Sequence, residues 1–156
     1  MYSIHEVLWK GDNIMDIQQM NTQQKGQYAQ LKIETRAAEL GYIVSKPTID
    51  TRYDLIIDDG IKLHKVQIKY GNGKSPNDSD GVIVVDLRKW AGDKRTEKRS
   101  YHSDEVDAIL VYIPAIDKIC WIPPEIFDGR PNLYLRFLPP KNNQTKGVLM
   151  VDDFYW

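Results

Sequence analysis

The sequence predicts an α/β domain built around a central mixed β-sheet. One long amphipathic segment comes early in the chain, short β-branched and aromatic segments follow it, and turn-forming residues separate them. A chain of 156 residues is long enough for one continuous core and too short for two large domains. We therefore expect one domain over residues 20–156. Residues 1–19, whose periodicity is weak, are expected to form an N-terminal arm or extension.

The order of the elements follows from apolar spacing and from glycine and proline. A helix is expected over residues 24–40, where apolar residues fall at helical spacing and Gly41 follows. The turn Asp58-Asp59-Gly60 joins two of the expected strands into a hairpin, and Pro123 opens a short helix. The expected strands cover residues 42–46, 52–58, 63–70, 81–87, 106–113, 118–122 and 133–138.

Composition limits the classes of protein to be considered. Hydrophobic residues make up 42% of the chain and charged residues 28%, and no run is apolar enough to span a membrane. Residues 1–19 lack the features of a secretory signal, and the one cysteine, Cys120, lies in an apolar run. We expect a soluble, intracellular protein, cytoplasmic with access to DNA, whose cysteine belongs to the core.

Charge is distributed unevenly along the chain. A net charge of −1 argues against a protein that coats nucleic acid by bulk electrostatics, yet residues 88–99 hold six basic residues and two acidic ones. The segment is interpreted either as a loop that contacts DNA phosphates and bases or as solvated surface. The candidate DNA-binding residues are Arg88, Lys89, Lys94, Arg95, Lys98 and Arg99.

The most informative residues are Asp54, Gln67 and Lys69. Side chains alternate along a strand, so Gln67 and Lys69 project to one face, and a hairpin brings Asp54 to the same edge. A carboxylate, an amide oxygen and the backbone carbonyl of Ile68 would suit Mg²⁺ or another divalent cation, with the lysine beside it. The local pattern alone leaves open a plain surface ion pair between Asp54 and Lys69.

A wider pattern resembles a known family. The order Lys25-Gly26, helix, Leu40-Gly41-Tyr42, Tyr53-Asp54-Leu55-Ile56 and Val66-Gln67-Ile68-Lys69 resembles the PD-(D/E)XK nucleases, especially their Holliday-junction-resolvase-like branch. This resemblance implies a restriction-endonuclease-like core, a mixed sheet flanked by helices. It also implies that Asp54 and Gln67 bind the divalent metal and that Lys69 positions the attacking water.

The resemblance also exposes a departure. The family places a glutamate on the first helix at the position that Gln30 occupies here, and Glu34, one turn later, substitutes for it only if the helix is shifted. Gln30 and Glu34 therefore both count as candidate catalytic residues. The replacement of two carboxylates by amides, at Gln30 and Gln67, weakens the expected metal site.

The functional expectation is a site-specific, Mg²⁺-dependent endonuclease that hydrolyses double-stranded DNA. The glutamine in the last motif, the small size and the basic segment resemble an intron-encoded homing endonuclease. Because one site cuts one strand, we expect a homo-oligomer, a dimer or tetramer. The alternatives are a Holliday-junction resolvase and a catalytically weakened DNA-binding module of the same fold.

Overall fold

A computed structural model of the chain describes residues 19–72, 81–91, 97–140 and 146–156. The arm predicted at residues 1–19 lies outside these ranges apart from Gln19. The elements are α1 (Thr22–Glu39), β1 (Ile43–Ser45), β2 (Leu55–Asp58), β3 (Leu63–Tyr70), β4 (Val82–Asp86), β5 (Arg88–Ala91), β6 (Glu97–Ser100), β7 (Ala108–Ile113), β8 (Lys118–Ile122), α2 (Pro124–Phe127), β9 (Asn132–Arg136) and the 3-10 helix η3 (Val151–Phe154).

Helix α1 begins at a complete capping box. The Asn21 side chain accepts a hydrogen bond from the Gln24 backbone N–H, and the Gln24 side chain accepts one from the Asn21 N–H, both at 2.9 Å. This reciprocal pair satisfies two backbone donors that a helix start leaves without partners. After α1 ends, Gly41 adopts a φ of 76°, which only glycine takes without steric cost. The predicted helix is therefore confirmed, with ends shifted by one or two residues.

The central sheet has five strands in the order β1-β2-β3-β7-β8. Strands β1, β2 and β3 are antiparallel neighbours, β3 and β7 are parallel, and β7 and β8 are antiparallel. The predicted hairpin is confirmed, because β2 pairs with β3 across the turn and Asp58 lies opposite Leu63. The predicted mixed sheet is confirmed by the single parallel pair.

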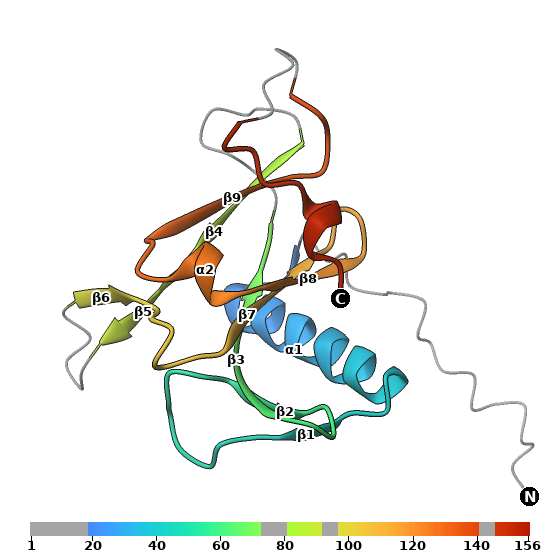
Figure 1. Ribbon diagram of the computed structural model, residues 1–156, viewed down its shortest axis with the longest axis vertical. Coiled ribbons are helices and arrows are strands. Elements are labelled where there is room, and N and C mark those ends of the chain that lie inside the picture. Colours follow the sequence, from blue (N-terminus) through green and yellow to red (C-terminus); the bar gives the residue numbers. More distant parts are fainter. Residues whose placement is uncertain (1–18, 73–80, 92–96, 141–145) are drawn as a thin grey trace, which may run out of the picture.

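The core lies on both faces of this sheet. On one face, Ala29 and Ile33 of α1 pack with Val66 and Leu110, all four fully buried. On the other face, strand β7 packs against β4 and β9, which form a separate two-stranded antiparallel sheet. Figure 1 shows α1 lying across the sheet and the β4–β9 ribbon beside it. A long helix thus covers one face, and β4, β9 and the short helix α2 cover the other.

The basic segment holds more structure than the sequence indicated. Its described residues form the antiparallel strands β5 and β6, in which Lys89 lies opposite Arg99 and Trp90 opposite Lys98. The ammonium of Lys98 is 5.5 Å from the centre of the Trp90 ring, an attractive contact across the ladder. The high charge hid this strand pair, because charged residues are usually sparse in strands. The β5–β6 ribbon extends to one side of the molecule (Figure 1).

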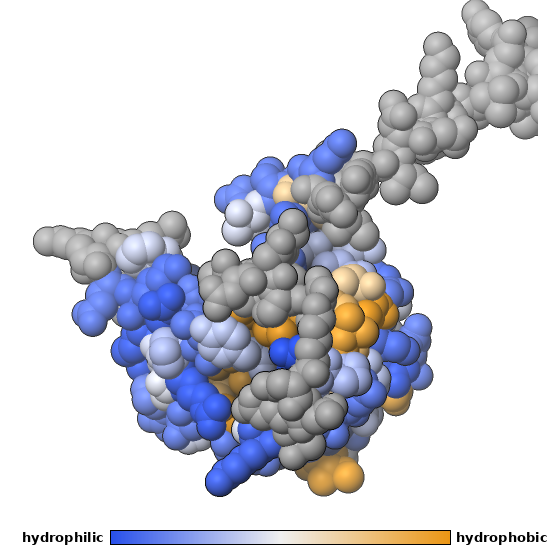
Figure 2. All heavy atoms as spheres, turned by 90° about the horizontal axis from the view of Figure 1, so that it is seen from above, coloured by the Kyte–Doolittle hydropathy of each residue, from blue (hydrophilic) through white to orange (hydrophobic). Residues whose placement is uncertain are grey.

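The described surface is mainly polar, and Cys120 belongs to the core as predicted. Hydrophilic residues cover most of the described surface on the face shown in Figure 2, and hydrophobic ones form small, separate patches. Cys120 is fully buried, and its thiol lies 3.7 Å from the carbonyl oxygen of Val151. None of the helices among the described residues is both long and apolar enough to cross a membrane.

Candidate active site

Asp54, Gln67 and Lys69 come together as the sequence predicted. Asp54 directly precedes β2, and its backbone N–H donates to the carbonyl of Val66 on β3 at 2.9 Å, which extends the hairpin ladder to Asp54. Val66 packs in the core beneath α1, so the alternation of β3 turns Gln67 and Lys69 toward the opposite face. Local strand geometry therefore places the carboxylate and the other two side chains at one edge of the hairpin.

The Gln67 side chain is almost fully buried and lies between two oxygen atoms. Its Nε2 donates to Oδ2 of Asp54 at 2.5 Å and to the carbonyl of Ile68 at 3.1 Å. The Ile68 N–H also donates to Oδ2 of Asp54, at 2.9 Å. The Gln67 amide oxygen, by contrast, is buried and has no hydrogen-bond partner in the described structure. The Asp54 carboxylate, the Ile68 carbonyl and the unpartnered amide oxygen of Gln67 therefore lie close together.

Burial perturbs the two charged groups of this site. It raises the pKa of Asp54, and the Ile68 N–H together with the positive charges of Lys89 and Lys69 only partly offsets this. Burial also lowers the pKa of Lys69 from 10.5 to about 8, against the attraction of nearby Asp86 and Asp54. Both shifts arise because water no longer solvates the charged form. A titratable pair perturbed in this way, at the edge of a sheet, is typical of a functional site.

Lys69 is held by a carbonyl and an aromatic ring. Its Nζ donates to the carbonyl of Arg88 at 3.0 Å and lies 5.1 Å from the centre of the Tyr101 ring. Tyr101 is buried, and its hydroxyl has no hydrogen-bond partner in the described structure. Asp54 and Lys69 are thus half-buried side chains, each with its own hydrogen-bond partners, rather than a solvated surface ion pair.

The two helix residues do not join this group. Gln30 donates to Glu34 at 2.7 Å, and Glu34 forms an ion pair with Lys46 at 2.9 Å. Within the described structure, no hydrogen bond or ion pair links either residue to Asp54, and no three His, Cys, Asp or Glu side chains gather to hold a metal ion. The catalytic roles of Gln30 and Glu34 stay predictions, without support from this geometry.

The basic candidates fall into two groups. Lys94 and Arg95 lie outside the described residues. Each of the other four is paired with a carboxylate of the same chain. Arg88 and Lys98 both bind Asp86, at 2.8 and 3.1 Å, Lys89 binds Asp50, and Arg99 binds Glu105. These four cations are therefore ion-paired within the chain, and two of them share one carboxylate, that of Asp86.

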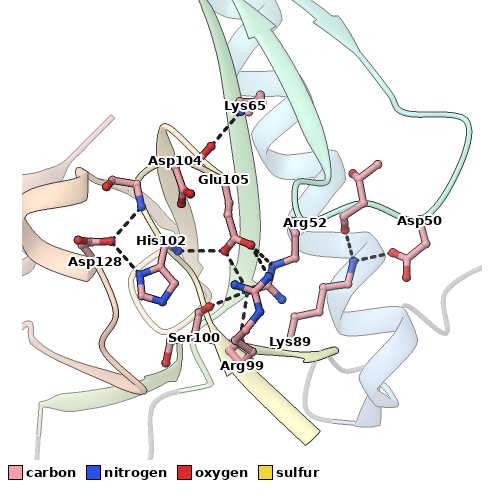
Figure 3. Close-up of polar contacts among 12 residues, drawn as sticks. Asp50, Arg52, Lys65, Lys89, Arg99, Ser100, His102, Asp104, Glu105 and Asp128 are labelled. Atoms are coloured by element: carbon pink, nitrogen blue, oxygen red, sulfur yellow. Dashed lines mark hydrogen bonds and ion pairs between the residues drawn. The ribbon is translucent and has the colours of Figure 1, made fainter. Parts of the chain in front are cut away.

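Sequence reasoning missed Arg52 and Glu105, which connect β6 to the segment that precedes Asp54. Glu105 accepts hydrogen bonds from the guanidinium groups of Arg52 and Arg99 and from the His102 N–H (Figure 3). Burial alone would raise the pKa of Glu105, yet the Arg99 hydrogen bond and the charge of Arg52 lower it overall. No sequence signal pairs Arg52 with a residue 53 positions later.

The chain matches a known sequence family and is similar to a solved structure. A sequence model described as "PD-(D/E)XK endonuclease" matches residues 20–156. The fold is similar to that of a bacterial homing endonuclease, I-Ssp6803I, with a TM-score of 0.70 and 24% identity over 87% of this chain and 89% of that chain. No curated protein matches the chain.

Proposed function

This chain belongs to the PD-(D/E)XK endonuclease family, and from that premise we propose that it is a metal-dependent, site-specific endonuclease that hydrolyses phosphodiester bonds of double-stranded DNA. The observation that carries the proposal is the convergence of Asp54, Gln67 and the Ile68 carbonyl beside the half-buried Lys69. Carboxylate, carbonyl and amide oxygens are the donors that a hard divalent cation prefers.

The donor set fits Mg²⁺, although it contains one charged ligand. A half-turn of the Gln67 amide exchanges its nitrogen and its unpartnered oxygen, and the oxygen then faces Asp54 and the Ile68 carbonyl. Three oxygens that face one another in a buried site repel unless a cation lies among them. Asp54, Gln67 and Ile68 would hold the ion. When bound, Mg²⁺ would polarise the scissile phosphate and favour ionisation of a bound water.

Lys69 supplies the second part of the chemistry. Its ammonium, held by the Arg88 carbonyl, faces the same edge as Asp54 and carries positive charge at neutral pH, because its pKa is about 8. In this place it orients the attacking water and stabilises the negative charge that develops on the phosphate. A fixed charge that points into a buried pocket stabilises a transition state more than the same charge does in water.

The finer assignment is a homing endonuclease. It is supported by the likeness to I-Ssp6803I and by the β5–β6 ribbon, a two-stranded element of the kind that fits the major groove. Because one site hydrolyses one strand, a double-strand break requires a homo-oligomer, and we propose a dimer or tetramer. A catalytically weakened DNA-binding module is the second candidate, because Asp54 is the one charged ligand in the proposed donor set and the Glu34 carboxylate of α1 is ion-paired with Lys46.

A cleavage assay tests the proposal. The parent protein, Asp54→Ala and Asp104→Ala are incubated with Mg²⁺ or EDTA and with genomic duplex, random-sequence duplex or a four-way junction. We expect cleavage of a few sites in genomic duplex that requires Mg²⁺, is lost in Asp54→Ala and is retained in the exposed control Asp104→Ala. Cleavage confined to the junction would favour a resolvase. Binding without cleavage would favour the weakened module, and full activity of Asp54→Ala would overturn the site.

A further inference from the structure

Arg52 connects two parts of the chain that the proposed reaction uses together. It lies two residues before Asp54, and its Nη2 donates to the carbonyls of Arg99 and Ser100, at 3.2 and 2.7 Å, where β6 ends. The guanidinium is also bonded to Glu105, at 3.3 to 3.4 Å. Figure 3 shows Arg52 pointing from its segment into this cluster of β6 residues.

A second connection runs parallel to the first. From β5, the ammonium of Lys89 reaches the Asp50 carboxylate and the Thr51 carbonyl, as Figure 3 also shows. Both strands of the β5–β6 ribbon are therefore bonded to residues 50–52, the segment that enters Asp54. Arg52 is the better anchored of the two cations. It contacts a carboxylate and two carbonyls, whereas Lys89 contacts a carboxylate and one carbonyl.

Arg52 also contacts the aromatic ring that lies beside Lys69. Its Cζ lies 4.3 Å from the centre of the Tyr101 ring, the same ring that Lys69 approaches to 5.1 Å. Tyr101 is almost fully buried and cannot move without disturbing the core around it. One rigid ring thus sets the distance between the segment before Asp54 and the predicted catalytic lysine.

We propose that Arg52 is a positioning residue that fixes the Asp54 carboxylate and the β5–β6 ribbon as one rigid unit. The guanidinium is suited to this role because its Nη2 donates to two carbonyls and a carboxylate while its flat face lies over the Tyr101 ring, a combination that the compact ammonium of lysine does not reproduce. The metal-binding consequence rests on the proposed function, but the positioning itself does not. Asp54 accepts the Ile68 N–H, so the order of its carboxylate has a direct backbone reporter.

Residue-resolved hydrogen exchange measures this order without metal or DNA. The matched reference is Lys65, also on β3, whose N–H donates to the Asp107 carboxylate at 2.8 Å, as the Ile68 N–H does to Asp54 at 2.9 Å. In Arg52→Lys we expect the Ile68 amide to exchange about tenfold faster, with the Lys65 amide unchanged. The exposed control Arg130→Lys should leave both amides at the parent rate.

The outcomes separate positioning from the alternatives. If Arg52 acts only through its charge, Arg52→Lys keeps the parent exchange rate at Ile68, and the inference fails. If Arg52 only stabilises the whole fold, both amides accelerate equally, and it fails as well. Glu105→Gln, which removes the negative charge of one partner of Arg52 and keeps the two carbonyls, should accelerate the Ile68 amide by a smaller factor.

Calorimetric titration with Mn²⁺ then links the inference to metal binding. We expect Arg52→Lys to bind Mn²⁺ several-fold more weakly than the parent and than Arg130→Lys. An unchanged affinity, in a parent that binds the ion, would overturn the inference. A parent that neither binds Mn²⁺ nor cleaves DNA would overturn the proposed function, while the exchange rates at Ile68 would still decide the role of Arg52.

Discussion

Replacement of Lys69 by methionine is expected to stabilise the folded protein while it removes nuclease activity. Methionine has a similar length and no charge, so it fills the same space without a cation to bury. The pKa of Lys69 falls from 10.5 to about 8 because burial disfavours the ammonium. A shift of this size corresponds to about 3 kcal/mol of destabilisation at neutral pH.

The sign of the pH dependence follows from proton binding. Below pH 8 the lysine is protonated in both the folded and the unfolded state, so the folded state carries the full cost of burying the charge. Between pH 8 and 10.5 the unfolded state binds more protons, so the free energy of unfolding rises with pH. The hydrogen bond from Lys69 to the Arg88 carbonyl offsets about 1 kcal/mol of the gain in the variant. The net stabilisation of Lys69→Met is therefore about 2 kcal/mol at pH 7.

Urea unfolding in EDTA, at pH 7 and at pH 10, measures both effects. The control is Lys65→Met, on the same strand and face but bonded only weakly, at 3.5 Å, to the Asp104 carbonyl, and its stability should lie within about 0.5 kcal/mol of the parent. The parent should approach the stability of Lys69→Met as the pH rises to 10. Lys65→Met keeps Lys69, so its free energy of unfolding should rise with pH as that of the parent does. If Lys69→Met is no more stable than the parent at pH 7, or if the difference in stability between these two proteins does not narrow between pH 7 and pH 10, the burial argument is wrong.

Three further predictions concern the residues around this site. Gln67→Glu should lower the free energy of unfolding in EDTA by about 2 kcal/mol, because the carboxylate of Asp54 loses a donor and gains a repelling neighbour. Mg²⁺ should restore more stability to this variant than to the parent. Equal thermal stability of the two proteins in EDTA would contradict the amide contact. Asp86→Asn frees two cations of the β5–β6 ribbon, so the slope of log affinity for random duplex against log salt should steepen by about one unit per cation that gains a phosphate, whereas Asp104→Asn should leave it unchanged. Gln30→Glu places two like charges one turn apart and should cost about 0.5 kcal/mol, with no change in Mg²⁺ affinity; tighter Mg²⁺ binding would instead bring α1 into the metal site.

Much of the fold follows from local patterns in the sequence. The turn Asp58-Asp59-Gly60 and the alternating residues 63–70 specify a hairpin. Gly60 adopts the positive φ that the tight turn needs, and a shift of the pairing by one residue would turn the apolar side chains of the strand to the opposite face. The same alternation places Gln67 and Lys69 on one face and Asp54 at its edge. These relations span few residues, so the sequence alone determined them, together with the fold class and the presence of the first helix, predicted over residues 24–40 and found over residues 22–39.

Only the tertiary structure decided the partners of the charged residues. The carboxylate that holds Arg52 lies 53 residues later, and the strand pair that orders the basic segment pairs Lys89 with Arg99 across residues that the sequence presents as a charged loop. Glu34 forms an ion pair with Lys46, which no spacing along the helix shows. Charged side chains have long reach and no periodicity, so their partners depend on how distant elements pack, whereas strand alternation and turn geometry depend on the local backbone.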